Sequence, residues 1–169
     1  MSFVLLQTNK LTFIDFYKNK VELSFEKDYF SDNTKHVWVI CKLNGNWLLT
    51  RHEDRGIEFP GGKVEEGETA DEAAVREVYE ETGGVVETLL KIGQYKVTAK
   101  HDIVIKNIYF AEISELVEKE HYFETNGPVL LKELPQKIKQ NKQYSFIMKD
   151  DVLTHSLRWL EKHRKELGI

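Results

Sequence analysis

Three glutamates, Glu77, Glu80 and Glu81, stand at spacings of i, i+3 and i+4. If the segment is helical, all three side chains project from one face, where like charges this close destabilise an isolated helix. A divalent cation would compensate that repulsion, because hard cations such as Mg²⁺ take oxygen ligands. The pair Gly61-Gly62 precedes the segment. The residues therefore predict a loop, a helix and a metal site in one unit, which suits chemistry on a phosphate ester.

The helix is predicted by signals at both of its ends. Thr69 and Glu72 have the spacing of a capping box, with Thr69 at the N-cap. Small and apolar residues repeat every four positions from Ala70 and supply a stripe that can be buried. Gly83 follows the last turn, where glycine is the usual stop. The alternative interpretation is a solvated helix face, because glutamate is a good helix former.

A wider pattern around the three glutamates is more specific. Counted from Gly62, the motif GX5EX7REUXEEXGU is filled at its fixed polar and glycine positions by Glu68, Arg76, Glu77, Glu80, Glu81 and Gly83. The segment therefore resembles the Nudix box, and the chain is identified as a member of that family. The last motif position usually holds a bulky aliphatic residue, and here it is Gly84. We expect Val85 to take over its packing role after a slip of one residue.

The resemblance implies a metal site that holds Mg²⁺ or Mn²⁺. Its ligands would be Glu77, Glu80, Glu81 and the main-chain carbonyl of Gly61. The three glutamates and Arg76 would also be the catalytic residues, with one glutamate, or a water held by them, as general base. A downstream carboxylate often completes the site in this family. Glu112 is the candidate chosen for it, and the alternatives are Glu118, Glu120 and Glu124.

Other residues near the motif have expected roles with open alternatives. Arg76 would orient one of the neighbouring glutamates through a charge-assisted bond, or form an ordinary helix salt bridge. Lys63 would touch a substrate phosphate, or remain a solvated lysine. Phe59 would stack on a nucleotide base, or pack in the core as aromatic residues in strands usually do. Glu68 is expected to support the loop rather than to bind metal.

Length and composition indicate a soluble globular protein. The 169 residues, 41% hydrophobic and 31% charged, are expected to form one domain over residues 1–169. The net charge of −4 provides no basic field, which argues against DNA as a partner, although a short RNA 5′ end could be held at the site itself. The single Cys41 fits a reducing compartment and a core position. We find no signal peptide and no long apolar run, and we predict a cytoplasmic protein without membrane contact.

The rest of the chain is predicted to be mainly strands. His36–Leu43 and Trp47–Thr50 flank the turn Asn44-Gly45-Asn46 and predict a hairpin. Further strands are expected at residues 11–16, 20–25, 91–100, 103–113 and 129–134. A helix is expected from Asp150 or Asp151 to the end, and residues 137–142 show no clear preference. These elements predict an α/β protein with a mixed sheet between helices. The family resemblance implies the Nudix α/β/α sandwich.

Segments outside the motif, such as residues 52–65 and 145–153, are similar to MutT-type nucleoside triphosphatases, above all to their bacterial YtkD-type branch. This resemblance implies metal-dependent cleavage of nucleoside or deoxynucleoside triphosphates, guanine forms and 8-oxo-dGTP first, to a monophosphate and pyrophosphate. The first alternative is removal of pyrophosphate from RNA 5′ ends. Hydrolysis of sugar nucleotides or dinucleotides also stays open. A non-catalytic nucleotide-binding domain is disfavoured, because such domains typically lose carboxylates of the motif and all three are present here.

Overall fold

The structure is a computed structural model that describes residues 9–169. Its strands are β1 (Leu11–Ile14), β2 (Lys20–Ser24), β3 (His36–Leu43), β4 (Asn46–His52), β5 (Gly56–Glu58), β6 (Gly61–Lys63), β7 (Gly84–Thr98), β8 (Ile103–Leu116) and β9 (Thr125–Leu131). Its helices are α1 (Ala70–Thr82) and α2 (Asp151–Leu167), with short 3₁₀ turns η1 (Ile138–Gln140) and η2 (Phe146–Met148).

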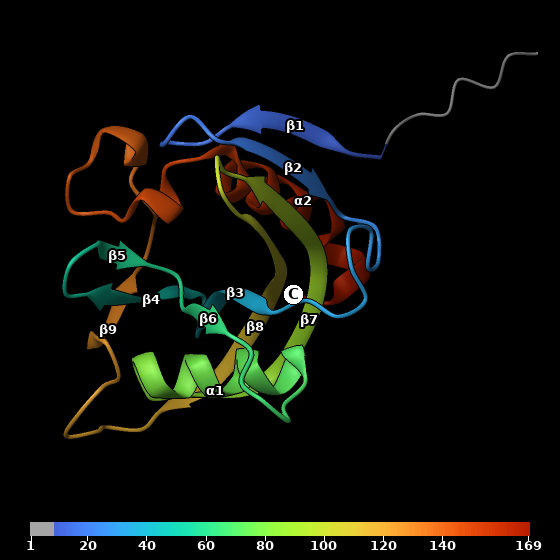
Figure 1. Cartoon of the computed structure of the whole chain (residues 1–169). Helices are drawn as coiled ribbons and strands as arrows, with labels where there is room; N and C mark the ends of the chain where they lie inside the picture. The colour runs from blue at the N-terminus through green and yellow to red at the C-terminus, as the bar shows by residue number, and fades with distance from the viewer. Residues whose placement is uncertain (1–8) are drawn as a thin grey trace, which may run out of the picture.

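The strands form one mixed sheet in the order β1-β2-β7-β8-β3-β4-β5, while β6 pairs with β3 and β9 pairs with β4. The pairing of β3 with β8 is parallel, and the other strand pairings are antiparallel. Figure 1 shows α1 and α2 on opposite sides of this sheet. The predicted α/β/α sandwich with a mixed sheet is therefore confirmed.

Each face of the sheet has its own hydrophobic core, because successive side chains of a strand point to opposite faces. In β3, Trp38 and Ile40 belong to the cluster that includes α2 residues such as Leu160. Val39 and Cys41 belong to the cluster that includes α1 residues such as Val78. The expected core position of Cys41 is confirmed.

Helix α1 begins and ends where the sequence predicts. The Thr69 hydroxyl accepts a hydrogen bond from the Glu72 N–H at 3.2 Å, and the Glu72 carboxylate accepts one from the Thr69 N–H at 2.7 Å. Gly83 adopts a left-handed conformation with φ of 75°, and its N–H donates to the Tyr79 carbonyl at 2.8 Å. A side chain at Gly83 would also lie 2.1 Å from the Val117 carbonyl oxygen. The capping box and the glycine stop are both confirmed.

The expectation for Val85 is wrong. Gly84 is buried, and a Cβ atom there would lie 3.1 Å from Val78 and 3.2 Å from Leu48. Glycine lets β7 begin close against α1 without a linker. The valine that packs against the α1-side core is Val86, after a register shift between Val85 and Val86. The packing role moves by two residues because the strand contains this irregularity.

The short strands β5 and β6 were not predicted, and the largest differences from the predicted boundaries are in β7 and β9. Strand β7 begins at Gly84 rather than at residue 91, because register shifts along its first half interrupt the alternation of apolar and polar residues. Strand β9 covers Thr125–Leu131 rather than residues 129–134. It contains Gly127-Pro128, which argues against a central strand, but among the described strands β9 pairs only with β4 and so can accommodate proline. The hairpin of β3 and β4 and the C-terminal helix are confirmed.

Within residues 9–169, no helix is both long enough and apolar enough to cross a membrane. The single-domain organisation and the cytoplasmic location stay predictions.

Candidate active site

A cavity of about 670 Å³ lies where β3, β5, β6 and α1 meet. A cavity of this size can hold one nucleotide. Its lining contains both signs of charge. Acidic groups come from Glu58, Glu65, Glu77 and Glu124, and basic groups come from Arg55, Lys63 and Lys106. The register places Lys106 of β8 directly beside His36 of β3, which also lines the cavity.

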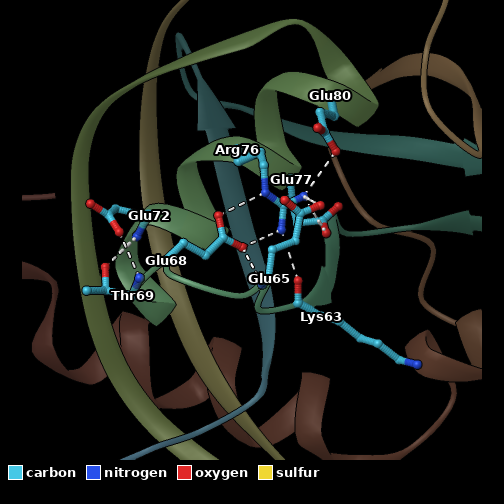
Figure 2. Close-up of polar contacts among 8 residues, drawn as sticks. All are labelled: Lys63, Glu65, Glu68, Thr69, Glu72, Arg76, Glu77 and Glu80. Atoms are coloured by element: carbon cyan, nitrogen blue, oxygen red, sulfur yellow. Dashed lines mark hydrogen bonds and ion pairs between the residues drawn. The ribbon is translucent and has the colours of Figure 1, made fainter.

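Arg76 is the centre of a network of carboxylates beside this cavity (Figure 2). Its Nη1 donates to Glu77 Oε1 at 3.0 Å and to Glu80 Oε2 at 3.1 Å. Its Nε and Nη2 donate to the two oxygens of Glu68 at 3.0 and 2.6 Å. Nη2 also donates to the main-chain carbonyl of Lys63 at 2.9 Å. One planar guanidinium therefore fixes two of the three predicted metal ligands and the loop that precedes them.

Glu68 connects this network to the loop between β6 and α1. Its Oε1 accepts a hydrogen bond from the Glu65 N–H at 2.7 Å in addition to the bond from Arg76. The ion pair with Arg76 is the first cause that holds the pKa of Glu68 below its usual value. These contacts agree with the loop-supporting role expected of Glu68.

Glu81 is the most deeply buried of the three predicted ligands, with 6% of its surface exposed. Burial, followed by the nearby carboxylates of Glu77 and Glu58, raises the pKa of Glu81 to about 9. Its Oε2 atom is buried and has no hydrogen-bond partner among residues 9–169. Burial also raises the pKa of Glu77, against the influence of Arg76. Desolvated carboxylates of this kind are typical of functional sites.

Two threonines that the sequence analysis did not identify hold the end of α1 in place. The hydroxyl of Thr50 on β4 donates to the Glu81 carbonyl at 2.9 Å, and the hydroxyl of Thr125 on β9 donates to the same oxygen at 3.1 Å. Both threonines are buried. The backbone of Glu81 is thereby tied to two neighbouring strands of the sheet.

The two glycines before the helix allow their backbone to lie close to the Glu77 carboxylate and to strand β3. A Cβ atom at Gly62 would lie 2.1 Å from Glu77 Oε1, and a Cβ atom at Gly61 would lie 2.4 Å from the Val37 carbonyl oxygen. Gly61 pairs with Trp38 in the short ladder between β6 and β3. Only glycine therefore lets the Glu77 carboxylate lie against this loop.

The donor groups fit a divalent cation. They are carboxylate oxygens, which Mg²⁺ and Mn²⁺ prefer, and the buried Glu81 Oε2 has an unused lone pair. Among residues 9–169, no three His, Cys, Asp or Glu side chains converge as a preformed metal cluster. Instead, Arg76 forms ion pairs with Glu77 and with Glu80. The assignment of Glu77, Glu80, Glu81 and the Gly61 carbonyl as ligands stays a proposal.

The structure does not bring Glu112 to this site. Glu112 follows Phe110 by two residues on β8 and thus shares the sheet face that packs against α2. It lines a different cavity, together with Leu160 and Arg164 of α2. The choice of Glu112 as the downstream ligand is therefore wrong. Of the alternatives, Glu124 lines the cavity beside Glu77.

The two predicted substrate-binding residues differ in exposure, because Phe59 is buried and Lys63 is exposed. Phe59 borders the cavity but is only 1% exposed, and its ring packs edge-on against Trp38 and Trp47, each at a centroid distance of 5.9 Å. It is a core residue and has no free face for a base. The Lys63 side chain is exposed at the cavity and points away from Arg76 (Figure 2).

The sequence analysis missed an ion pair in the cavity wall between the exposed Arg55 and the buried Glu58. Arg55 donates to both carboxylate oxygens of Glu58, from Nη2 at 2.7 Å and from Nε at 3.1 Å, and Glu58 is 3% exposed. Lys106 is a half-buried cation of the same cavity, and desolvation lowers its pKa. The sequence signal that could have identified Glu58 was its position between the apolar residues Ile57 and Phe59, shortly before the glycine pair. Both neighbours are buried in the structure.

The motif that surrounds this site matches a known family. The NUDIX domain model matches residues 32–150, which include the cavity, α1 and most of the sheet. The chain belongs to the Nudix family. It is 59% identical over 150 residues to Bacillus subtilis YtkD, provisionally named an 8-oxo-dGTP diphosphatase, and the alignment covers 89% of this chain and 95% of that protein.

Similarity to a solved structure is equally extensive. The crystal structure of the Bacillus subtilis pyrophosphohydrolase BsRppH matches with a TM-score of 0.89 and 57% identity, over 90% of this chain and 96% of that one. A shorter segment of 46 residues is 46% identical to an RNA pyrophosphohydrolase of Tolumonas auensis, covering 27% of this chain and 26% of that protein. The protein is thus a Nudix pyrophosphohydrolase. Nudix hydrolases act on nucleotide substrates and generally use divalent metals.

Proposed function

We propose that this enzyme cleaves guanine nucleoside and deoxynucleoside triphosphates, including 8-oxo-dGTP, to a nucleoside monophosphate and pyrophosphate. The observation that carries the proposal is the pair of half-buried Glu77 and buried Glu81 beside Arg76, with Glu77 in the wall of a cavity of nucleotide size. The 59% identity to YtkD supports the guanine preference.

The carboxylates would hold Mg²⁺ or Mn²⁺, with Glu77, Glu80, Glu81 and the Gly61 carbonyl as ligands and Glu124 within the same cavity. When bound, such a cation neutralises polyphosphate charge and lowers the pKa of water. Arg76 keeps two of the carboxylates oriented, so that little reorganisation is needed when substrate enters.

The remaining cavity residues bind and position the substrate. Lys63, Arg55 and Lys106 supply positive charge toward the phosphates. A water molecule attacks phosphorus, the bond to the bridging oxygen breaks, and pyrophosphate leaves with that electron pair. One of the three motif glutamates takes the proton from the attacking water.

A panel of substrates tests the guanine preference. We expect kcat/KM for dGTP and 8-oxo-dGTP to exceed the values for dCTP and ADP-ribose under one set of conditions. A site that hydrogen-bonds one base edge rejects unmatched bases strongly, so the difference is expected to reach at least about 10²-fold. A preference for dCTP or for ADP-ribose would overturn the assignment.

The second candidate is removal of pyrophosphate from the 5′ end of triphosphorylated RNA. The local similarity to an RNA pyrophosphohydrolase and the extensive similarity to BsRppH favour it. The chemistry at the phosphates is the same in both cases. Including a 5′-triphosphorylated oligoribonucleotide in the panel decides between them, because a higher kcat/KM for the RNA moves the assignment to 5′-end processing.

A further inference from the structure

The connection from β8 to β9, residues 117–124, lies beside α1 (Figure 1). It is called the β8–β9 segment below. Most of it is at the surface, where Phe123 is 63% exposed. Its last residue reaches the active site, because Glu124 and Glu77 line the same cavity. The position of this segment relative to α1 therefore decides where the Glu124 carboxylate stands beside the motif glutamates.

The β8–β9 segment is tied at both ends to the C-terminal end of α1. The Val117 N–H donates to the Gly83 carbonyl at 2.8 Å. At the other end, the hydroxyl of Thr125 donates to the Glu81 carbonyl at 3.1 Å. Residues 118–124 lie between these two hydrogen bonds and belong to no helix or strand. A further contact is needed to hold the middle of the segment against the helix.

Lys119 provides that contact. Its Nζ donates to the main-chain carbonyls of Tyr79 and Glu80, each at 3.1 Å. Within the described part of the chain, these are the hydrogen bonds that join residues 118–124 to α1. Carbonyls at the C-terminal end of a helix carry partial negative charge, which a cation stabilises. Helix α1 has no basic residue in its own last turn, so Lys119 supplies the cation from another part of the chain.

Three aromatic rings surround the Lys119 ammonium. Its Nζ lies 4.7 Å from the centre of the Tyr79 ring, 5.4 Å from that of Tyr122 and 5.8 Å from that of Phe123. The faces of aromatic rings attract cations. Two hydrogen bonds and three rings hold this half-buried side chain in one place, whereas a solvated surface lysine samples many rotamers. Lys119 is therefore a fixed link between the segment and the helix.

This link is attached to the carboxylate network of the active site. The carbonyl of Glu80 accepts the bond from Lys119, and the carboxylate of Glu80 accepts the bond from Arg76 at 3.1 Å. The same lysine holds the segment that ends in Glu124. Displacing a catalytic group by about 1 Å can cost 10²-fold in rate, so a contact that fixes both backbones affects catalysis without touching the substrate.

We propose that Lys119 is a positioning residue of the active site, which holds the motif glutamates of α1 and Glu124 of the β8–β9 segment in place relative to each other. The proposal rests on the pyrophosphohydrolase function and on the motif glutamates as metal ligands. It adds a residue that lies outside the Nudix motif and is not part of the cavity wall. Lys119 acts through the Glu80 carbonyl and through the backbone of the segment.

Three variants test this role in steady-state kinetics. Lys119→Met keeps an unbranched side chain of similar length and removes the ammonium, while Lys119→Arg keeps the charge and the donors. Lys132→Met, at an exposed position just beyond β9, removes the same charge elsewhere and is the matched control. For the nucleotide that the wild type hydrolyses fastest, Lys119→Met should lower kcat at least about tenfold, the scale of lost support for a metal ligand, and leave KM within about twofold. Lys119→Arg should regain most of the rate, and Lys132→Met should equal wild type.

Binding of Mn²⁺ alone separates positioning from simple electrostatics. Free Mn²⁺ is measured by electron paramagnetic resonance, without substrate. Loss of a positive charge near the carboxylates would by itself tighten the binding of a cation. Loss of positioning should weaken it, by at least about tenfold in Lys119→Met, because the ligands are no longer held together. Unchanged or tighter Mn²⁺ binding in Lys119→Met would overturn the proposal.

Amide hydrogen exchange reports the link without metal or turnover. Peptides that cover residues 117–124 and the last turn of α1 should exchange faster in Lys119→Met than in wild type. If circular dichroism shows that Lys119→Met does not fold, Phe123→Ala removes one exposed ring beside the ammonium and should produce smaller changes in the same direction.

The outcomes for Lys119 and for the proposed function are distinguishable. If the wild type hydrolyses no nucleotide while Lys119→Met still weakens Mn²⁺ binding and speeds exchange, the proposed function fails and the positioning role stands. Three results would overturn the positioning role and leave the function intact: a wild-type kcat in Lys119→Met, equal rates in Lys119→Met and Lys119→Arg, or an equal loss in Lys132→Met, which would assign the effect to net charge.

Discussion

Replacing the buried Glu81 by glutamine should stabilise the protein in the absence of metal. At pH 7.5 the Glu81 carboxyl is largely protonated in the folded state, since its pKa is about 9, while the unfolded chain has the usual value near 4.5 and is ionised. Folding therefore takes up a proton, and stability falls as the pH rises from 4.5 toward 9. Glutamine has the same shape, does not titrate, and can donate from its amide to the Glu77 carboxylate.

The magnitude follows from the difference between the two pKa values. Between pH 4.5 and pH 7.5 the cost of keeping Glu81 protonated grows to at most about 4 kcal/mol, at about 1.4 kcal/mol for each pH unit. For a protein of this size, each kcal/mol changes the Tm by about 2–4 °C. The Tm of Glu81→Gln should therefore exceed that of wild type by several degrees at pH 7.5 and should equal it near pH 4.5.

Differential scanning calorimetry in EDTA from pH 4.5 to pH 8 measures this dependence. Glu87→Gln, at an exposed position of β7, is the control and should show no such trend. Added Mg²⁺ should raise the Tm of wild type at pH 7.5, because a ligand that binds only the folded state stabilises it. The same addition should raise the Tm of Glu81→Gln less. A lower Tm than wild type at pH 7.5, or a difference that does not depend on pH, would refute the reasoning.

Other substitutions test the remaining parts of the site. Glu80→Gln should lower kcat by about 10²-fold or more without unfolding the protein, and Glu68→Gln should cost less, as steady-state rates and circular dichroism will show. Arg76→Lys should also lower kcat, by about tenfold or more, because an ammonium cannot replace the fork that holds three carboxylates. Gly62→Ala should lower kcat by about 10²-fold, because its Cβ atom displaces the Glu77 carboxylate, while the Tm changes little. Near-normal rates in Glu80→Gln and Gly62→Ala together would place the active site elsewhere.

Local spacing predicted the parts of the site that lie on one element. The cap at Thr69, the stop at Gly83 and the contact of Arg76 with its neighbouring glutamates all follow from distances of a few residues along a helix. Composition also predicted the hairpin of β3 and β4, because a run of β-branched and aromatic residues and an Asn-Gly turn are both local signals.

Parts of the site that depend on strand pairing could not be predicted in this way. Lys106 reaches the cavity because β8 pairs in parallel with β3, and that pairing joins residues about 70 positions apart. Glu112 was chosen wrongly for the same reason: alternation shows that successive side chains point to opposite faces, but not which face meets α1. Burial of Glu81 likewise depends on packing against β4 and β9, which a helical pattern does not contain.

Phosphorus NMR of a reaction with dGTP tests the central claim most directly. With Mg²⁺ present, the first products should be dGMP and pyrophosphate in equal amounts, and the Glu80→Gln variant should form them at least about 10²-fold more slowly. After the metal is stripped and excess EDTA is added, no turnover should occur, because the carboxylates alone cannot neutralise a triphosphate. Orthophosphate as the first product, or sustained hydrolysis in EDTA, would contradict the account.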